Sequence, residues 1–121
     1  MVASLRLMSE GRRRLVEDPI SFWDQRHRDF DPWRSGGDRG LTEEENQEFY
    51  DLRVAQILTL IRKHQSTDRS LRVLDAGCGR GHLTEALRSV GHVVVGMDSS
   101  ESAVEAARAA HGGDFRVSTL Q

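Results

Sequence analysis

The stretch VLDAGCGRGHLTEAL, residues 73–87, constrains the fold of this 121-residue chain more than any other feature. Branched apolar residues lead into three glycines at alternate positions, Gly77, Gly79 and Gly81, and a helix-like run follows. A turn of this kind between a strand and a helix places free backbone N–H groups at the carboxyl edge of a sheet. Glycine also lets the backbone approach a ligand closely. The sequence therefore predicts a ligand-binding turn at the end of a strand.

The rest of the chain predicts alternating helices and strands. Apolar residues at helical spacing predict a helix over 42–64, with Thr42 and Glu45 forming a capping box at its start. The other predicted elements are a strand at 71–77, a helix at 83–91, a strand at 92–98, a helix at 101–113 capped by Ser100, and a strand at 114–120. This order is typical of an α/β layer with a parallel sheet and right-handed crossovers.

Four large aromatic residues lie close together before the first long helix. Phe22, Trp23, Phe30 and Trp33 fall within residues 22–33. Aromatic side chains at this density usually bury against other residues, so we expect them to dock the N-terminal segment onto the core. The alternative is that some of them line the mouth of a site.

Composition argues against several classes of partner. The formal net charge of −2 gives no overall attraction to nucleic acid or to anionic membranes. Cys78 is the single cysteine, so no internal disulfide can form, which fits a reducing compartment. No apolar run approaches the ~20 residues of a membrane span. We therefore expect a cytoplasmic location and a small-molecule partner. The histidines lack the spacing of a metal site.

With Asp75 before the glycines, VLDAGCGRGHLT resembles the first motif of the class I S-adenosylmethionine-dependent methyltransferases, V-L-D-x-G-C-G-x-G. The resemblance covers residues 71–104. It implies an α/β, Rossmann-like three-layer sandwich with parallel strands. The chain is expected to supply the part of the sheet with strand order 3-2-1, preceded by N-terminal helices, while the remainder of the sheet is missing. It also implies that S-adenosylmethionine is the cofactor, that S-adenosylhomocysteine is the product, and that the methyl group passes to an acceptor, here expected to be a small molecule.

The same resemblance assigns roles around the glycine turn. The turn is expected to wrap the methionine and ribose portion of the ligand, and Asp75 to bear on its amino end. Asp98 ends the second predicted strand 21 residues after Gly77. An acidic residue about 20 positions after the first glycine can take both hydroxyls of a ribose. Ser99 is expected to lie along the adenosine.

A third contact, with adenine, departs from the family pattern. Aligning Phe115 with the phenylalanine of F-x-x-x-D-A places Thr119 where the family has aspartate. Cys78 and His82 are better explained as structural residues than as a nucleophile and a catalyst. The predicted cofactor-binding residues are Asp75, Gly77, Cys78, Gly79, Gly81, Asp98, Ser99 and Thr119. No catalytic residue is assigned, because the family draws its acceptor pocket largely from later segments.

The domain organisation follows from these assignments. We predict a flexible leader at 1–19, an N-terminal helical cover at 20–69 and a partial S-adenosylmethionine-binding domain at 70–121. Trp23, Trp33 or Tyr50 of the cover are candidates for the acceptor side. The strand at 71–76 lacks its inner neighbour of the family fold, and it could pair with a second copy or with the missing C-terminal half.

Two other function classes stay open. An NAD(P)-binding oxidoreductase would require G-x-G-x-x-G, and His82 stands where the third glycine belongs. A non-catalytic S-adenosylmethionine-binding or assembly module could use the same half of the fold.

Overall fold

The computed structural model describes residues 18–65 and 69–119, which form five helices and three strands. Their bounds are α1 Pro19–Asp29, α2 Pro32–Gly36, α3 Glu43–His64, β1 Arg72–Ala76, α4 His82–Ser89, β2 Val93–Asp98, α5 Glu101–His111 and β3 Phe115–Val117. The predicted leader lies, up to residue 17, outside the described residues. Among those that are described, no helix combines the length and the apolar character needed to cross a membrane.

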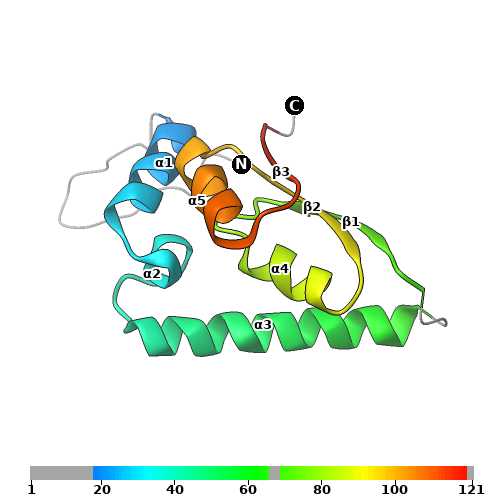
Figure 1. Cartoon of the computed structure of the whole chain (residues 1–121). Helices are drawn as coiled ribbons and strands as arrows, with labels where there is room; N and C mark the ends of the chain where they lie inside the picture. The colour runs from blue at the N-terminus through cyan, green and yellow to red at the C-terminus, as the bar shows by residue number, and fades with distance from the viewer. Residues whose placement is uncertain (1–17, 66–68, 120–121) are drawn as a thin grey trace.

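The three strands form one parallel sheet in the order β1-β2-β3 (Figure 1). Leu74 of β1 pairs in register with Val95 of β2, and Gly96 of β2 pairs with Phe115 of β3. This confirms the predicted Rossmann-like order 3-2-1. Within the described residues β1 is an edge strand, as the missing inner neighbour implied.

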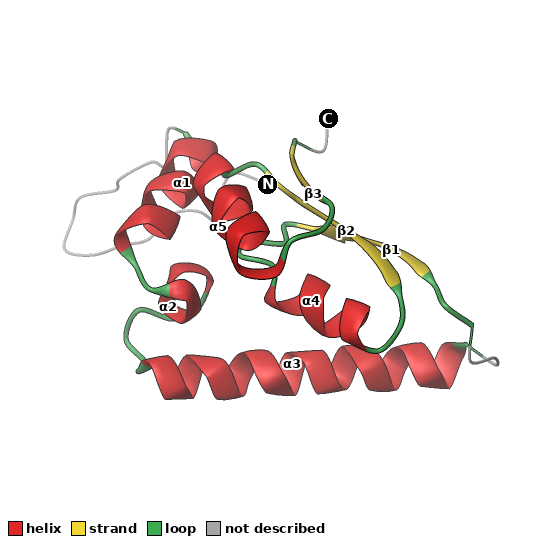
Figure 2. Cartoon of the chain, viewed as in Figure 1, coloured by secondary structure: helices red, strands yellow, loops and turns green. Residues whose placement is uncertain are grey.

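The helices gather on one side of the sheet (Figure 2). On the covered face, Val94 and Phe115 are 3% and 2% exposed, whereas Leu74 and Val93 on the other face are 56% and 61% exposed. Successive side chains of a strand point to opposite faces. β1 and β2 are therefore covered on one face only, and the described residues supply the sheet and one of the helical layers.

The aromatic segment forms two short helices that begin in the same way. Asp18 caps α1 by accepting hydrogen bonds from the amides of Ile20 and Ser21, and Asp31 caps α2 through the amide of Trp33 at 3.1 Å. Proline stands at the start of each helix, where its missing N–H has no cost. Local capping thus makes this part of the predicted cover helical.

The long helix α3 confirms the prediction for residues 42–64. The side chain of Thr42 accepts from the amide of Glu45, and the side chain of Glu45 accepts from the amide of Thr42 at 2.8 Å. The apolar residues along one side of α3 turn toward α4, which α3 contacts. The long helix therefore covers the sheet indirectly, through α4.

The glycine-rich loop at residues 35–40, before α3, is held by the buried side chain of Asn46, a contact that no local sequence pattern indicates. Asn46 is 2% exposed. Its Oδ1 accepts from the amide of Asp38 at 2.8 Å, and its Nδ2 donates to the carbonyls of Asp38 and Thr42 at 2.8 and 3.0 Å. These bonds fix α2 relative to α3 and so shape the cover over the site.

Candidate cofactor site

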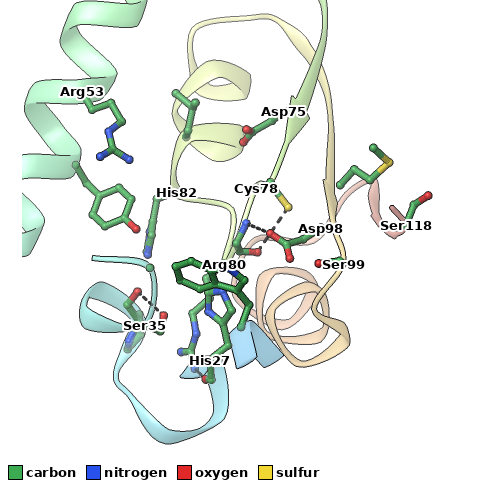
Figure 3. A pocket seen from close by; sticks show the side chains of 18 of the residues that line it. His27, Ser35, Arg53, Asp75, Cys78, Arg80, His82, Asp98, Ser99 and Ser118 are labelled. Atoms are coloured by element: carbon green, nitrogen blue, oxygen red, sulfur yellow. Dashed lines mark hydrogen bonds between the residues drawn. The ribbon is translucent and has the colours of Figure 1, made fainter. Parts of the chain in front are cut away.

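A cavity of about 510 Å³ opens where the carboxyl ends of β1 and β2 meet the cover helices (Figure 3). The residues that line it come from the glycine turn, the strand ends and the cover. Seven of the eight predicted cofactor-binding residues line it: Asp75, Gly77, Cys78, Gly79, Asp98, Ser99 and Thr119. The structure therefore brings together side chains that are widely spaced in the sequence.

The backbone of the turn differs from the expectation of free N–H groups. The amides of Gly77 and Cys78 both donate to the carbonyl of Met97, at 2.7 and 3.0 Å. These donors therefore join the turn to β2 instead of facing a ligand. Gly77 has φ +78°, and a Cβ built on it would meet nothing within 4 Å. Gly77 therefore contributes to the site by leaving the space beside its backbone open.

The carboxylate of Asp98 joins the ends of the first two strands. Its Oδ2 accepts from the amide of Gly79 at 2.8 Å, and its Oδ1 accepts from the amide of Ser100 at 2.8 Å. Each carboxylate oxygen can accept a further hydrogen bond. Asp98 is therefore fixed by the backbone, and it also keeps acceptor capacity toward the cavity that it lines.

Asp75 is held by a buried hydroxyl. Oγ1 of Thr84, on α4, donates to Oδ2 of Asp75 at 2.6 Å. Thr84 is fully buried, and nothing in the sequence analysis singled it out. The sequence signal that could have identified Thr84 is its position two residues after the start of the helix that follows the glycine turn.

Cys78 is buried and does not have the character of a nucleophile. Burial, followed by the nearby carboxylates of Asp75 and Asp98, raises the pKa of its thiol to about 12. The thiol therefore stays protonated near neutral pH, and only the thiolate is strongly nucleophilic. This agrees with the structural role preferred for Cys78 from the sequence.

Gly81 is the predicted site residue that does not line the cavity. It is buried with φ +84°, and a Cβ built on it would lie 2.7 Å from the ring of Phe115. Gly81 thus allows α4 to start against β3. Phe115, which the sequence analysis used only to align the third strand, fills the space under the turn.

Polar contacts dock α1 onto the ends of the sheet. Oδ1 of Asp24 accepts from Oγ of Ser100 at 2.8 Å and from the amide of Ser102 at 2.9 Å. Nη2 of Arg80, in the glycine turn, donates to the carbonyl of His27 at 2.5 Å. No local sequence pattern indicates these contacts, because their partners are 53 to 78 residues apart along the chain.

The aromatic residues of the cover divide into two groups. Trp23 and Tyr50 line the cavity, whereas Trp33 is absent from its wall. Trp33 instead stacks on His82, with ring centroids 4.1 Å apart and an interplanar angle of 11°. His82 lines the cavity as well, and burial lowers its pKa. His82, the first residue of α4, thus packs against the cover and also lines the cavity.

Comparison with known proteins agrees with this geometry. A family profile described as a methyltransferase domain matches residues 73–121. A ubiquinone biosynthesis O-methyltransferase from Rickettsia typhi is 30% identical over 90 residues, which are 74% of this chain and 35% of that protein. The protein of the same name from Coxiella burnetii is 46% identical over 46 residues, or 38% of this chain and 20% of that protein.

Solved structures extend the similarity to the cover helices. Magnesium protoporphyrin IX methyltransferase from Synechocystis with bound SAM shares 25% identity and a TM-score of 0.60, covering 88% of this chain and 57% of that one. Its structure with bound SAH shares 26% identity and a TM-score of 0.59, covering 85% and 52%.

The fold and site together define a Rossmann-like α/β domain with a ligand cavity at the carboxyl ends of its first two strands. With these matches, the fold and site agree with those of the class I S-adenosylmethionine-dependent methyltransferases. It spans about a fifth to a third of the length of the curated relatives described above.

Proposed function

We propose that this chain is the cofactor-binding part of a methyltransferase that uses S-adenosylmethionine and modifies a small-molecule acceptor. The observation that carries the proposal is the contact between Asp98 and the Gly79 amide, 2.8 Å apart at the ends of adjacent strands. It holds a carboxylate at the edge of the cavity where the ribose of an adenosyl ligand would lie.

The residues present fit such a ligand. Asp98 would accept hydrogen bonds from both ribose hydroxyls. Gly77 has no side chain, so it leaves room for the ligand to lie against the backbone. Asp75 has one oxygen that is not bonded to Thr84 and would meet the amino group. A cavity of about 510 Å³ lies in the size range of small-molecule sites.

S-adenosylmethionine would supply a methyl group activated by its sulfonium: a bond would form between a lone pair of the acceptor and the methyl carbon as the C–S bond breaks, with S-adenosylhomocysteine as the leaving group. Such a displacement depends mainly on alignment of the reacting atoms. The contribution of this chain would be to fix the nucleoside through Asp98 and to exclude water with the rings of Trp23 and Tyr50. The named function of the relatives, O-methylation, supports an oxygen acceptor.

Calorimetric titration with S-adenosylhomocysteine tests the proposal. The native chain should bind it, and Asp98→Ala should lower the affinity about 10- to 150-fold, because a hydrogen bond to a charged group contributes about 1.5–3 kcal/mol. Glu105→Ala, which removes an exposed carboxylate of α5, is the matched control and should bind like the native chain. Equal affinity of the native and Asp98→Ala chains would refute the ribose assignment.

The same titration separates the rival classes. Binding of NADH in place of S-adenosylhomocysteine would favour the oxidoreductase alternative. Binding of S-adenosylhomocysteine with no turnover of S-adenosylmethionine in the presence of candidate acceptors would favour a non-catalytic module.

We further propose a cytoplasmic location, supported by the single, buried thiol of Cys78. Cell fractionation followed by immunodetection tests it, and recovery with the membrane or secreted fraction would contradict it.

A further inference from the structure

We propose that His27, on the cover helix α1, makes a second hydrogen bond to the ribose of the adenosyl ligand, beside Asp98. This inference rests on the function proposed above and assigns a new residue to the same site.

His27 is buried at the edge of the cavity. It is 5% exposed, it is the buried residue of α1, and it lines the cavity together with Gly79 and Asp98. Its Cε1 and Nε2 lie 3.5 and 3.9 Å from the position of a Cβ on Gly79. One edge of the imidazole ring is therefore turned to the glycine turn, at the point where Gly79 donates to Asp98.

The ring carries hydrogen-bonding capacity that the described residues do not use. Nδ1 of His27 is buried and has no hydrogen-bond partner among them. Nδ1 itself is closed off from the cavity, so a ligand hydroxyl would bond to Nε2, which lies on the ring edge turned to Gly79.

The electrostatics favour a hydroxyl on the ribose side. Burial lowers the pKa of His27, while the carboxylate of Asp98 opposes this shift. The ring is therefore neutral near pH 7, with one nitrogen as donor and the other as acceptor, which matches the donor and acceptor capacity of a hydroxyl. His27 lies on the Asp98 side of the cavity, away from Asp75 (Figure 3).

The backbone around His27 is fixed without the ligand. Nη2 of Arg80 donates to the carbonyls of His27 and Phe30, at 2.5 and 3.4 Å. Asp24, one turn earlier, bonds to Ser102 at the start of α5. These contacts tie α1 both to the glycine turn and to the helix that follows Asp98, so the imidazole is positioned before a ligand arrives.

Ligand affinity of His27→Phe tests the inference, because phenylalanine keeps the ring packing and removes both nitrogens. Binding of S-adenosylhomocysteine and of 5′-methylthioadenosine, which lacks the amino-acid portion, should each weaken about 5- to 30-fold. His64→Phe, an exposed substitution at the end of α3, is the matched control and should bind both ligands like the native chain.

The outcomes separate this inference from the proposed function. Failure of the native chain to bind S-adenosylhomocysteine would overturn both. Native binding with unchanged affinity in His27→Phe would overturn this inference alone, and so would a loss confined to S-adenosylhomocysteine, since that would place His27 at the amino-acid end. If His27→Phe unfolds, ¹⁵N NMR of the native chain replaces it. Both ligands should then shift the His27 ring resonances and leave those of His64 in place, and an unmoved His27 overturns the inference.

Discussion

Oγ1 of Thr84 donates a hydrogen bond to Oδ2 of Asp75 across 2.6 Å, joining the first turn of α4 to the end of β1. The hydroxyl is fully buried, so it holds the Asp75 carboxylate at the cavity with a fixed orientation.

Thr84→Val should lower the free energy of unfolding by about 1–3 kcal/mol, because it keeps the shape of the side chain and leaves a part-buried carboxylate oxygen without its donor. Urea denaturation measures this change. Thr59→Val, in an exposed part of α3, is the control and should change stability by no more than about 0.5 kcal/mol. Equal effects of the two substitutions would show that the Thr84 bond does not stabilise the fold.

Gly81 and Gly77 should respond differently to alanine. Gly81→Ala combines a left-handed φ with a close approach to Phe115, so it should destabilise the chain by at least about 2 kcal/mol. Gly77→Ala meets no neighbour and should cost only the conformational penalty of about 1–2 kcal/mol, yet it should weaken S-adenosylhomocysteine binding roughly tenfold by filling the site. Thermal unfolding and calorimetry measure the two effects, and a larger stability loss at Gly77 would contradict this assignment.

Asp24→Ala should loosen α1 from the start of α5. The backbone N–H of Ser102 is the main cause that lowers the pKa of Asp24, ahead of the Ser100 hydroxyl. A carboxyl whose pKa is lowered by folding stabilises the folded state above its unfolded pKa of about 3.9 and loses this effect as the pH falls through the folded value. We expect faster amide hydrogen exchange in α1 at pH 7 for Asp24→Ala. Asp29→Ala, at the exposed end of the same helix, should exchange like the native chain.

His27, which is buried, and His82, which is half-buried, should make the free energy of unfolding depend on pH between about 5.5 and 7.5. Burial lowers the pKa of His27 and of His82, so the unfolded chain takes up protons more readily than the folded chain below about pH 6.5. The free energy of unfolding should therefore fall as the pH decreases from 7.5 to 5.5. His27→Phe should reduce this dependence in urea denaturation, and an unchanged slope would show that His27 titrates normally.

The exposed apolar face of the sheet should promote association of the chain. Leu74 and Val93 on this face are 56% and 61% exposed, and exposed apolar patches of this kind associate with other chains. Sedimentation velocity should show concentration-dependent self-association that Leu74→Lys reduces. Leu52→Lys, at an equally exposed position on α3, should leave the association unchanged.

Local patterns were sufficient to predict most of the fold. The capping box of Thr42 and Glu45 set the start of α3, and the glycine turn set the junction between β1 and α4. The element ends shifted by a residue or two, with the largest change in the last strand, predicted at 114–120 and observed at Phe115–Val117. The helix α1 was not assigned individually, because its start depends on the Asp18 cap and Pro19 and its apolar residues do not form a clear stripe.

The sequence by itself determined the order of the elements and the pairing of a glycine turn with Asp98, because capping, periodicity and glycine chemistry act over a few residues. The tertiary structure decided which groups face the cavity. Only the folded chain engages the Gly77 amide with Met97, turns Gly81 toward Phe115 and brings His27 over Gly79. Those contacts join residues that are far apart along the chain, so their geometry follows from packing and cannot be read from neighbouring residues.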